Sequence, residues 1–88
     1  MKIVWTREYR GSYVTNINGL TIEIYETIPH LRSIYTLHAN ARSVGGRVLY
    51  HLDIWTGIGP KPSWAKVKKI AEGWAITLPD AKEAPDAE

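Results

Sequence analysis

Two stretches near the N-terminus alternate apolar and polar residues with the period of a β-strand, Ser12–Ile17 and Leu20–Tyr25. Between them stands Asn18-Gly19, a pair of residues that tolerates the positive φ angles of a type I′ turn. The pattern therefore predicts a β-hairpin. The shorter stretch Lys2–Thr6 is a candidate for one more strand before it.

A second pair of strands is predicted further along the chain. Ser33–Ala39 alternates and is rich in β-forming residues, and Arg47–Trp55 forms a longer stretch of the same kind. The segment Asn40–Gly46 between them contains Asn, Ser and two Gly and is typical of a turn. In the second strand the even positions Val48, Tyr50, Leu52 and Ile54 are all apolar, whereas the odd positions Leu49, His51, Asp53 and Trp55 are mixed. The even positions are therefore expected to face the core.

The last third of the chain changes to the period of a helix. Gly57–Pro62 holds two glycines and two prolines, which favour a loop, and Ser63 follows at the position of an N-cap. Apolar residues then return every three or four positions, at Trp64, Val67, Ile70, Ala71, Trp74 and Leu78. This spacing predicts an amphipathic helix, in which Gly73 is an unfavourable residue.

Together these elements predict an α+β fold, a four- or five-stranded antiparallel β-meander with one C-terminal amphipathic helix packed on one face. One helix covers only one face, so the other is expected to stay open and to carry the function. The residues expected on it are Thr21, Glu23, Tyr25, Thr36, His38, Leu49, His51, Asp53 and Trp55. A shift of one residue in any register would exchange the faces.

The charge is unevenly distributed along the 88 residues, which carry a formal net charge of +2. The segment after Pro79 holds four acidic residues and one lysine, so residues 80–88 are expected to form a flexible acidic tail. The remaining residues 1–79 form a single predicted domain with ten Lys or Arg against five Asp or Glu, a charge of +5. A basic domain favours an acidic partner.

Cysteine is absent, which excludes disulfides, thiolate metal sites and a cysteine nucleophile. Arg7, Glu8 and Arg10 interrupt the N-terminus where a secretory leader needs apolar residues, and no apolar run approaches the length of a membrane span. The sequence therefore predicts a cytoplasmic protein without a membrane partner.

Candidate nucleic-acid contacts gather where the predicted helix begins, at Lys61, Lys66, Lys68 and Lys69, with Arg10 as a further candidate. Residues 47–74 resemble the second half of a double-stranded RNA-binding domain, in which a strand, a glycine-containing turn and a lysine-bearing helix start contact the backbone. The chain departs from that family at Pro60 and Pro62 and in opening with strands. Tyr9-Arg10-Gly11 is similar to the start of the plant AP2 pattern, a sheet that reads DNA. Both resemblances imply nucleic acid as the partner.

A histidine beside a carboxylate is common in acid–base catalysis and in metal sites. His51 and Asp53 are two residues apart and so share one face of the predicted strand. The spacings of 8 and 13 residues between His30, His38 and His51 match no metal motif, however. No nucleophile or nucleotide-binding motif is found either. The sequence thus predicts no catalytic residues, no metal site and no cofactor.

These observations predict a small non-enzymatic accessory protein, similar in style to those that phages and mobile elements encode, which binds nucleic acid or a complex that handles it. The alternative is a stoichiometric protein inhibitor or adaptor, in the manner of anti-CRISPR and other anti-defence proteins, which acts through the uncovered sheet face. Exposed rings are typical anchors of such interfaces. The residues assigned to this interface are Tyr25, His38, His51 and Trp55, and the same face is a candidate for homodimer formation.

Overall fold

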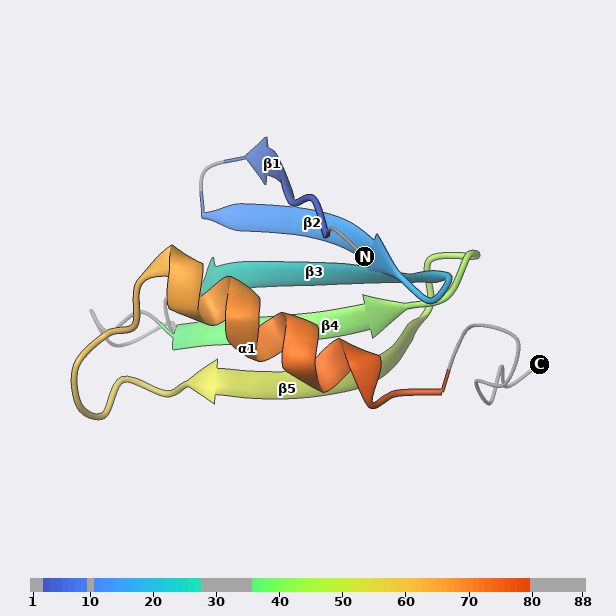
Figure 1. The fold of residues 1–88 in the computed structure, drawn as a ribbon. Coiled ribbons are helices and arrows are strands. Elements are labelled where there is room, and N and C mark those ends of the chain that lie inside the picture. The colour runs from blue at the N-terminus through green and yellow to red at the C-terminus, as the bar shows by residue number, and fades with distance from the viewer. Residues whose placement is uncertain (1–2, 10, 28–35, 80–88) are drawn as a thin grey trace.

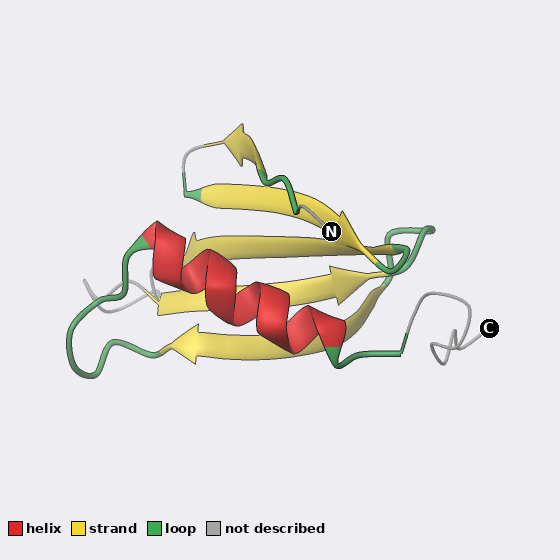
Figure 2. Ribbon diagram, in the orientation of Figure 1, coloured by secondary structure: helices red, strands yellow, loops and turns green. Residues whose placement is uncertain are grey.

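The computed structural model describes residues 3–9, 11–27 and 36–79. Its elements are β1 (Thr6–Tyr9), β2 (Ser12–Ile17), β3 (Leu20–Thr27), β4 (Thr36–Arg42), β5 (Val48–Trp55) and α1 (Trp64–Ile76). The strands form one antiparallel sheet in the order β1-β2-β3-β4-β5, and α1 lies obliquely across one face of it (Figures 1 and 2). The predicted α+β meander with one C-terminal helix is confirmed. Arg10, the acidic tail 80–88 and the start of the predicted strand Ser33–Ala39 lie outside the described residues.

The β2–β3 hairpin forms as its turn residues predict. Asn18 and Gly19 have φ angles of 54° and 81°, the left-handed values that a type I′ turn requires at both positions. Ile17 therefore pairs directly with Leu20, and the register continues to Ser12 opposite Tyr25. This turn fixes which side chains of the two strands share a face.

The core lies between the sheet and the helix. Ile22 and Ile24 on β3 stand opposite Ala41 and Ala39 on β4, and all four side chains are buried. Among the described residues, the buried apolar side chains are Ile17, Leu20, Ile22, Ile24, Leu37, Ala39, Ala41, Val67, Ala71 and Ala75. Large residues on β3 and small ones on β4 and α1 thus interdigitate across the two layers.

The helix starts where predicted, but its buried stripe is narrower than the sequence suggests. The Ser63 hydroxyl accepts a hydrogen bond of 3.2 Å from the backbone N–H of Lys66, as an N-cap does. The fully buried positions are Val67, Ala71 and Ala75, spaced four apart. Ile70, expected in the core, is 38% exposed. Three small residues therefore bring the helix against the sheet.

Two irregularities in the pairing of β4 with β5 correct the predicted faces of β5. Asp53 pairs with His38 but Trp55 pairs with Leu37, so one residue of β5 is inserted between these pairs. Because directly opposite residues of an antiparallel pair point to the same face, Trp55 lies on the covered face with the buried Leu37. The prediction that Trp55 lies on the uncovered face is wrong.

The second irregularity stands at the start of β5. Val48 pairs with Arg42 and Tyr50 with Ala41, which leaves Leu49 as the inserted residue. Val48, expected in the core, is 44% exposed, whereas Leu49, expected on the open face, packs against the core. The predicted core positions therefore hold at Tyr50, Leu52 and Ile54, which pack against the core, and fail at the two ends of β5.

Candidate functional site

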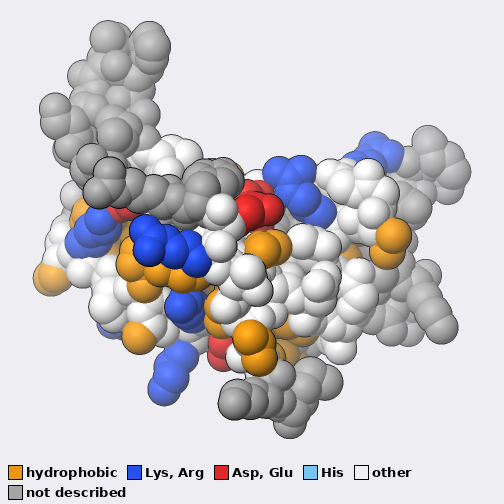
Figure 3. Space-filling view, turned by 90° about the horizontal axis from the view of Figure 1, so that it is seen from above, with side chains coloured by type: hydrophobic (Ala, Val, Ile, Leu, Met, Phe, Trp, Pro, Cys, Tyr) orange, Lys and Arg blue, Asp and Glu red, His pale blue; other side chains and the backbone are white. Residues whose placement is uncertain are grey.

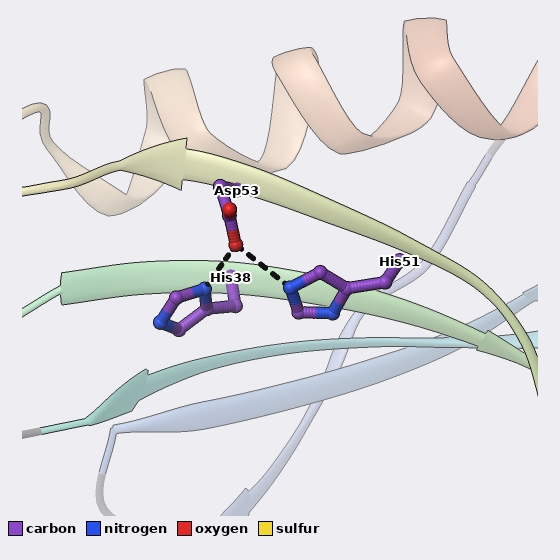
Figure 4. Close-up of side chains that lie close together, drawn as sticks. All are labelled: His38, His51 and Asp53. Atoms are coloured by element: carbon purple, nitrogen blue, oxygen red, sulfur yellow. Dashed lines mark hydrogen bonds and ion pairs between the residues drawn. The ribbon is translucent and has the colours of Figure 1, made fainter.

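The uncovered face of the sheet carries a cluster of two histidines and one carboxylate. His38 on β4 stands directly opposite Asp53 on β5, and His51 precedes Asp53 by two residues on the same strand. All three side chains therefore point to one face. Asp53 Oδ1 accepts hydrogen bonds from His38 Nδ1 at 2.8 Å and from His51 Nε2 at 2.7 Å, so both rings converge on a single oxygen atom (Figure 4). We refer to these residues as the His–Asp cluster.

The second ring nitrogen of His51 is held by a buried side chain. Its Nδ1 lies 2.7 Å from Asn40 Oδ1, and since an amide oxygen only accepts, the ring nitrogen donates. The amide nitrogen of Asn40 donates in turn to the hydroxyl of Tyr25 at 3.3 Å. Asn40 is only 9% exposed, so this polar group supports the His51 ring from within the sheet.

His38 is held in the same way from the other side. Its Nε2 lies 2.9 Å from Thr36 Oγ1, and that hydroxyl lies 2.7 Å from Thr27 Oγ1 on the neighbouring strand. The His38 ring also stands 5.5 Å from the Tyr25 ring and 5.4 Å from the His51 ring, centre to centre. Hydrogen bonds and ring contacts together fix the orientation of both histidines.

The cluster shifts the acidity of its carboxyl group. The hydrogen bond from His38, and after it the one from His51, holds the pKa of Asp53 below its ordinary value of 3.8. Both bonds favour the charged carboxylate, because a carboxylate accepts two N–H groups better than a neutral acid does. Asp53 is therefore a carboxylate throughout the neutral and mildly acidic range.

Two shallow hollows continue this polar face toward β1. One of about 260 Å³ is lined by Glu8, Val14, Thr21, Glu23 and Arg42, and the next, of about 270 Å³, by Glu23, Tyr25, Asn40 and Arg42. Arg42 and Glu23 line both hollows and form an ion pair of 3.4 Å. The surroundings of the His–Asp cluster are thus polar and open to solvent.

A different surface gathers positive charge at the start of α1. Lys66 and Lys69 are exposed, and neither has an acidic partner within 4 Å among the described residues. The first turn of the helix contains no acidic residue, so the positive end of its dipole is not compensated. Figure 3 shows Lys and Arg side chains interleaved with hydrophobic ones at this end of the molecule. We refer to Lys66, Lys68 and Lys69 as the helix lysines.

Two aromatic rings belong to this surface. Lys68 Nζ stands 4.1 Å from the centre of the Tyr13 ring, the geometry of a cation–π contact. Tyr13 in turn lies 4.9 Å from Trp64, ring centre to ring centre. Lys61, by contrast, forms an ion pair with Glu26, so much of its charge is already neutralised. Among the predicted lysines, the three on the helix carry the free positive charge.

The structure thus divides the predicted site residues between two surfaces. Tyr25, His38 and His51 lie together on the uncovered face, and the helix lysines lie on the side of α1. Sequence reasoning placed Thr36 on this face without its contact to His38, and it missed Asn40, which orients His51. Asn40 falls in the segment Asn40–Gly46, whose composition is typical of a turn. Only the cross-strand register shows that it stands opposite His51.

Comparisons with known protein families, with curated proteins and with solved structures found no match. No helix in the described part of the chain combines the length and the apolar character needed to cross a membrane. The function must therefore be argued from the two surfaces themselves.

Proposed function

We propose that this chain is a non-enzymatic nucleic-acid-binding protein that contacts the phosphate backbone with the helix lysines. The observation that carries the proposal is the combination of Lys66, Lys68 and Lys69 with an uncompensated helix N-terminus. Lysine ammonium groups and free backbone N–H groups at a helix start both attract phosphate. The proposal implies a cytoplasmic protein, in the compartment where nucleic acid is accessible.

The position of the acidic side chains supports this choice of surface. The single acidic residue of α1, Glu72, accepts a hydrogen bond of 2.7 Å from the Trp5 indole, and the other lysine of the region, Lys61, is paired with Glu26. The carboxylate of Glu72 is therefore engaged by the Trp5 indole, and among the described residues no carboxylate lies within 4 Å of the three helix lysines. Tyr13 and Trp64 beside Lys68 add aromatic surface of the kind that bases stack on.

Binding of this kind should tolerate changes of sequence and depend strongly on salt. Phosphate contacts carry no base information, and each neutralised phosphate releases counterions. The test is fluorescence anisotropy with a short labelled duplex of scrambled sequence, and with the matching single strand, over a series of salt concentrations. The logarithm of the binding constant should fall linearly with the logarithm of salt concentration.

A pair of charge-matched variants makes the test specific to α1. Lys66→Ala with Lys69→Ala should make the salt slope shallower by up to about two units. Arg42→Ala with Arg47→Ala removes the same charge at the other end of the sheet, beside the β4–β5 turn, and should leave the slope close to that of the unchanged protein (Figure 1). Equal effects of both pairs, or no binding to either probe at low salt, would contradict the proposal.

The protein-inhibitor alternative has less support. It depends on exposed apolar anchors on the uncovered face, and Trp55, its largest proposed anchor, lies on the covered face. Its other residues, Tyr25, His38 and His51, are engaged in a polar network. Protein interfaces are usually centred on apolar and aromatic groups, so this face suits a different kind of ligand.

A further inference from the structure

The His–Asp cluster brings three potential metal ligands from two neighbouring strands to one point. His38, His51 and Asp53 each offer one ligand atom, and the three atoms all lie within 4.8 Å of one another. The arrangement follows from the register, which places His38 opposite Asp53 and leaves His51 on the diagonal (Figure 4). Two imidazole nitrogens and one carboxylate oxygen thus lie together on the open face, with each nitrogen within 2.8 Å of the oxygen.

We propose that His38, His51 and Asp53 bind a zinc ion or a closely related divalent transition metal. Imidazole nitrogen suits first-row transition ions, and two histidines with one carboxylate are a recurrent zinc ligand set. Mg²⁺ and Ca²⁺ prefer all-oxygen ligands, so neither should compete at this site. The site lies on the open sheet face, apart from the helix lysines, and is independent of the proposed nucleic-acid contact.

The distances require only a small rearrangement of side chains. With zinc bonds of about 2.0–2.2 Å, tetrahedral ligand atoms stand roughly 3.3 Å apart. His38 Nδ1 and His51 Nε2 now stand 2.8 and 2.7 Å from Asp53 Oδ1. The ion would enter between these atoms in place of the shared hydrogens. The side chains of His51 and Asp53 are 46% and 56% exposed, which leaves them room to turn.

The groups behind the histidines match those of metal sites. A metal-bound histidine usually gives its other ring nitrogen to an oxygen acceptor, which fixes the ring and its tautomer. The Nδ1–H of His51 donates a hydrogen bond to Oδ1 of the buried Asn40, and His38 Nε2 is hydrogen-bonded to Thr36 Oγ1. In both rings the nitrogen that donates to Asp53 is therefore the one that would give up its hydrogen and bind the metal. This support distinguishes the cluster from an incidental surface pair.

Exposure predicts what kind of site this is. The side chain of His38 is 19% exposed and the two other ligands are about half exposed, so the remaining coordination positions face water. A site with three protein ligands and an open position differs from the closed four-ligand sites that hold a fold together. We therefore expect a protein that folds without metal and gains stability when zinc is added.

Isothermal titration of the tag-free chain with zinc chloride tests the proposal. We expect one ion per chain, and a rise in the melting temperature that grows with zinc concentration, as mass action requires. His38→Gln, His51→Gln and Asp53→Asn should each weaken the affinity at least about tenfold, since each removes a ligand. Calcium or magnesium chloride should produce neither heat nor stabilisation.

Two variants serve as matched controls. Glu23→Gln removes a carboxylate from the same sheet face, and His30→Gln removes the third histidine of the chain. Both should bind zinc as the unchanged protein does. Zinc affinity that is unaffected in all three ligand variants, or that is lost in His30→Gln, would overturn the assignment.

A measurement on the unchanged protein avoids any dependence on how the variants fold. In NMR spectra of the histidine side chains, zinc should shift the ring signals of His38 and His51 and leave those of His30 in place. Shifts at His30 alone, or none at one equivalent of zinc, would refute the proposal. A protein that binds zinc but not nucleic acid would leave this site intact and reject only the function proposed for α1.

Discussion

The two faces of the sheet are made by the same strands but have opposite chemistry. On β3, Ile22 and Ile24 face the helix and are fully buried, whereas Glu23 and Tyr25 face solvent and form polar contacts. On β4 the buried Leu37 and Ala39 alternate with His38 in the same way. One face therefore holds the fold together, while the other is free to carry ligand chemistry.

The side chains of the two faces contribute unequally to the free energy of unfolding. Burial of an Ile or Leu side chain contributes about 1.5–3 kcal/mol, and its removal also leaves a cavity. Hydrogen bonds between half-exposed groups exchange with water and contribute much less. The fold should therefore tolerate changes on the open face and resist them on the covered face.

The largest effect is expected from a truncation at the centre of the covered face. Ile24→Ala should lower the free energy of unfolding by about 2–5 kcal/mol, because Ile24 is fully buried in the middle strand. Asn16→Ala, at an exposed position of β2, should change it by no more than about 0.5 kcal/mol. Urea denaturation followed by tryptophan fluorescence measures both. Similar losses for the two variants would remove the distinction between the faces.

A smaller effect should separate two residues of a single strand. Trp55→Ala should cost about 2 kcal/mol, since the ring is partly buried against the core and its indole N–H donates to the Ile58 carbonyl at 3.0 Å. His51→Gln on the opposite face should cost no more than about 0.5 kcal/mol. The same denaturation assay applies. A silent Trp55→Ala together with a damaging His51→Gln would show that the inserted residue of β5 is placed wrongly.

The smallest effect concerns pH and belongs to the open face alone. The histidines hold the pKa of Asp53 below 3.8, so their contribution to stability is present above that value and is lost as the pH falls through the lowered pKa. In zinc-free buffer, the stability difference between the unchanged protein and Asp53→Asn should therefore shrink on acidification below about pH 4.

The control for this titration lies in the core. Ile24→Val removes one methylene group from the covered face, where no titratable side chain belongs to the buried apolar cluster. Its cost should stay constant over the same acid range, as followed by urea denaturation at each pH. A difference for Asp53→Asn that is equally constant would show that the cluster does not stabilise the carboxylate.

Much of the fold could be predicted from local signals. Asn18-Gly19 determines its own turn, because few other residues adopt two consecutive positive φ angles. Ser63 marks the start of α1 for an equally local reason, since its hydroxyl satisfies an N–H three residues later. Strict alternation on β3 predicted its buried face correctly.

The candidate site was less predictable, because its geometry depends on distant pairing. His38 and Asp53 are fifteen residues apart, and no spacing rule for metal ligands covers residues that meet across two strands. Asn40 and Thr36 gain their roles only from the side chains opposite or beside them. The sequence alone thus indicated the right residue types but not their convergence.

The sequence by itself determined the order of the elements, the hairpin turn, the start of the helix and the apolar face of β3, because each depends on residues close together in the chain. Only the tertiary structure decided the faces at the ends of β5, where two inserted residues turn Trp55 toward the core and Val48 toward solvent. It also decided that His38, His51 and Asp53 meet. Cross-strand register sets such contacts, and register depends on the packing of the whole sheet against its helix rather than on any local pattern.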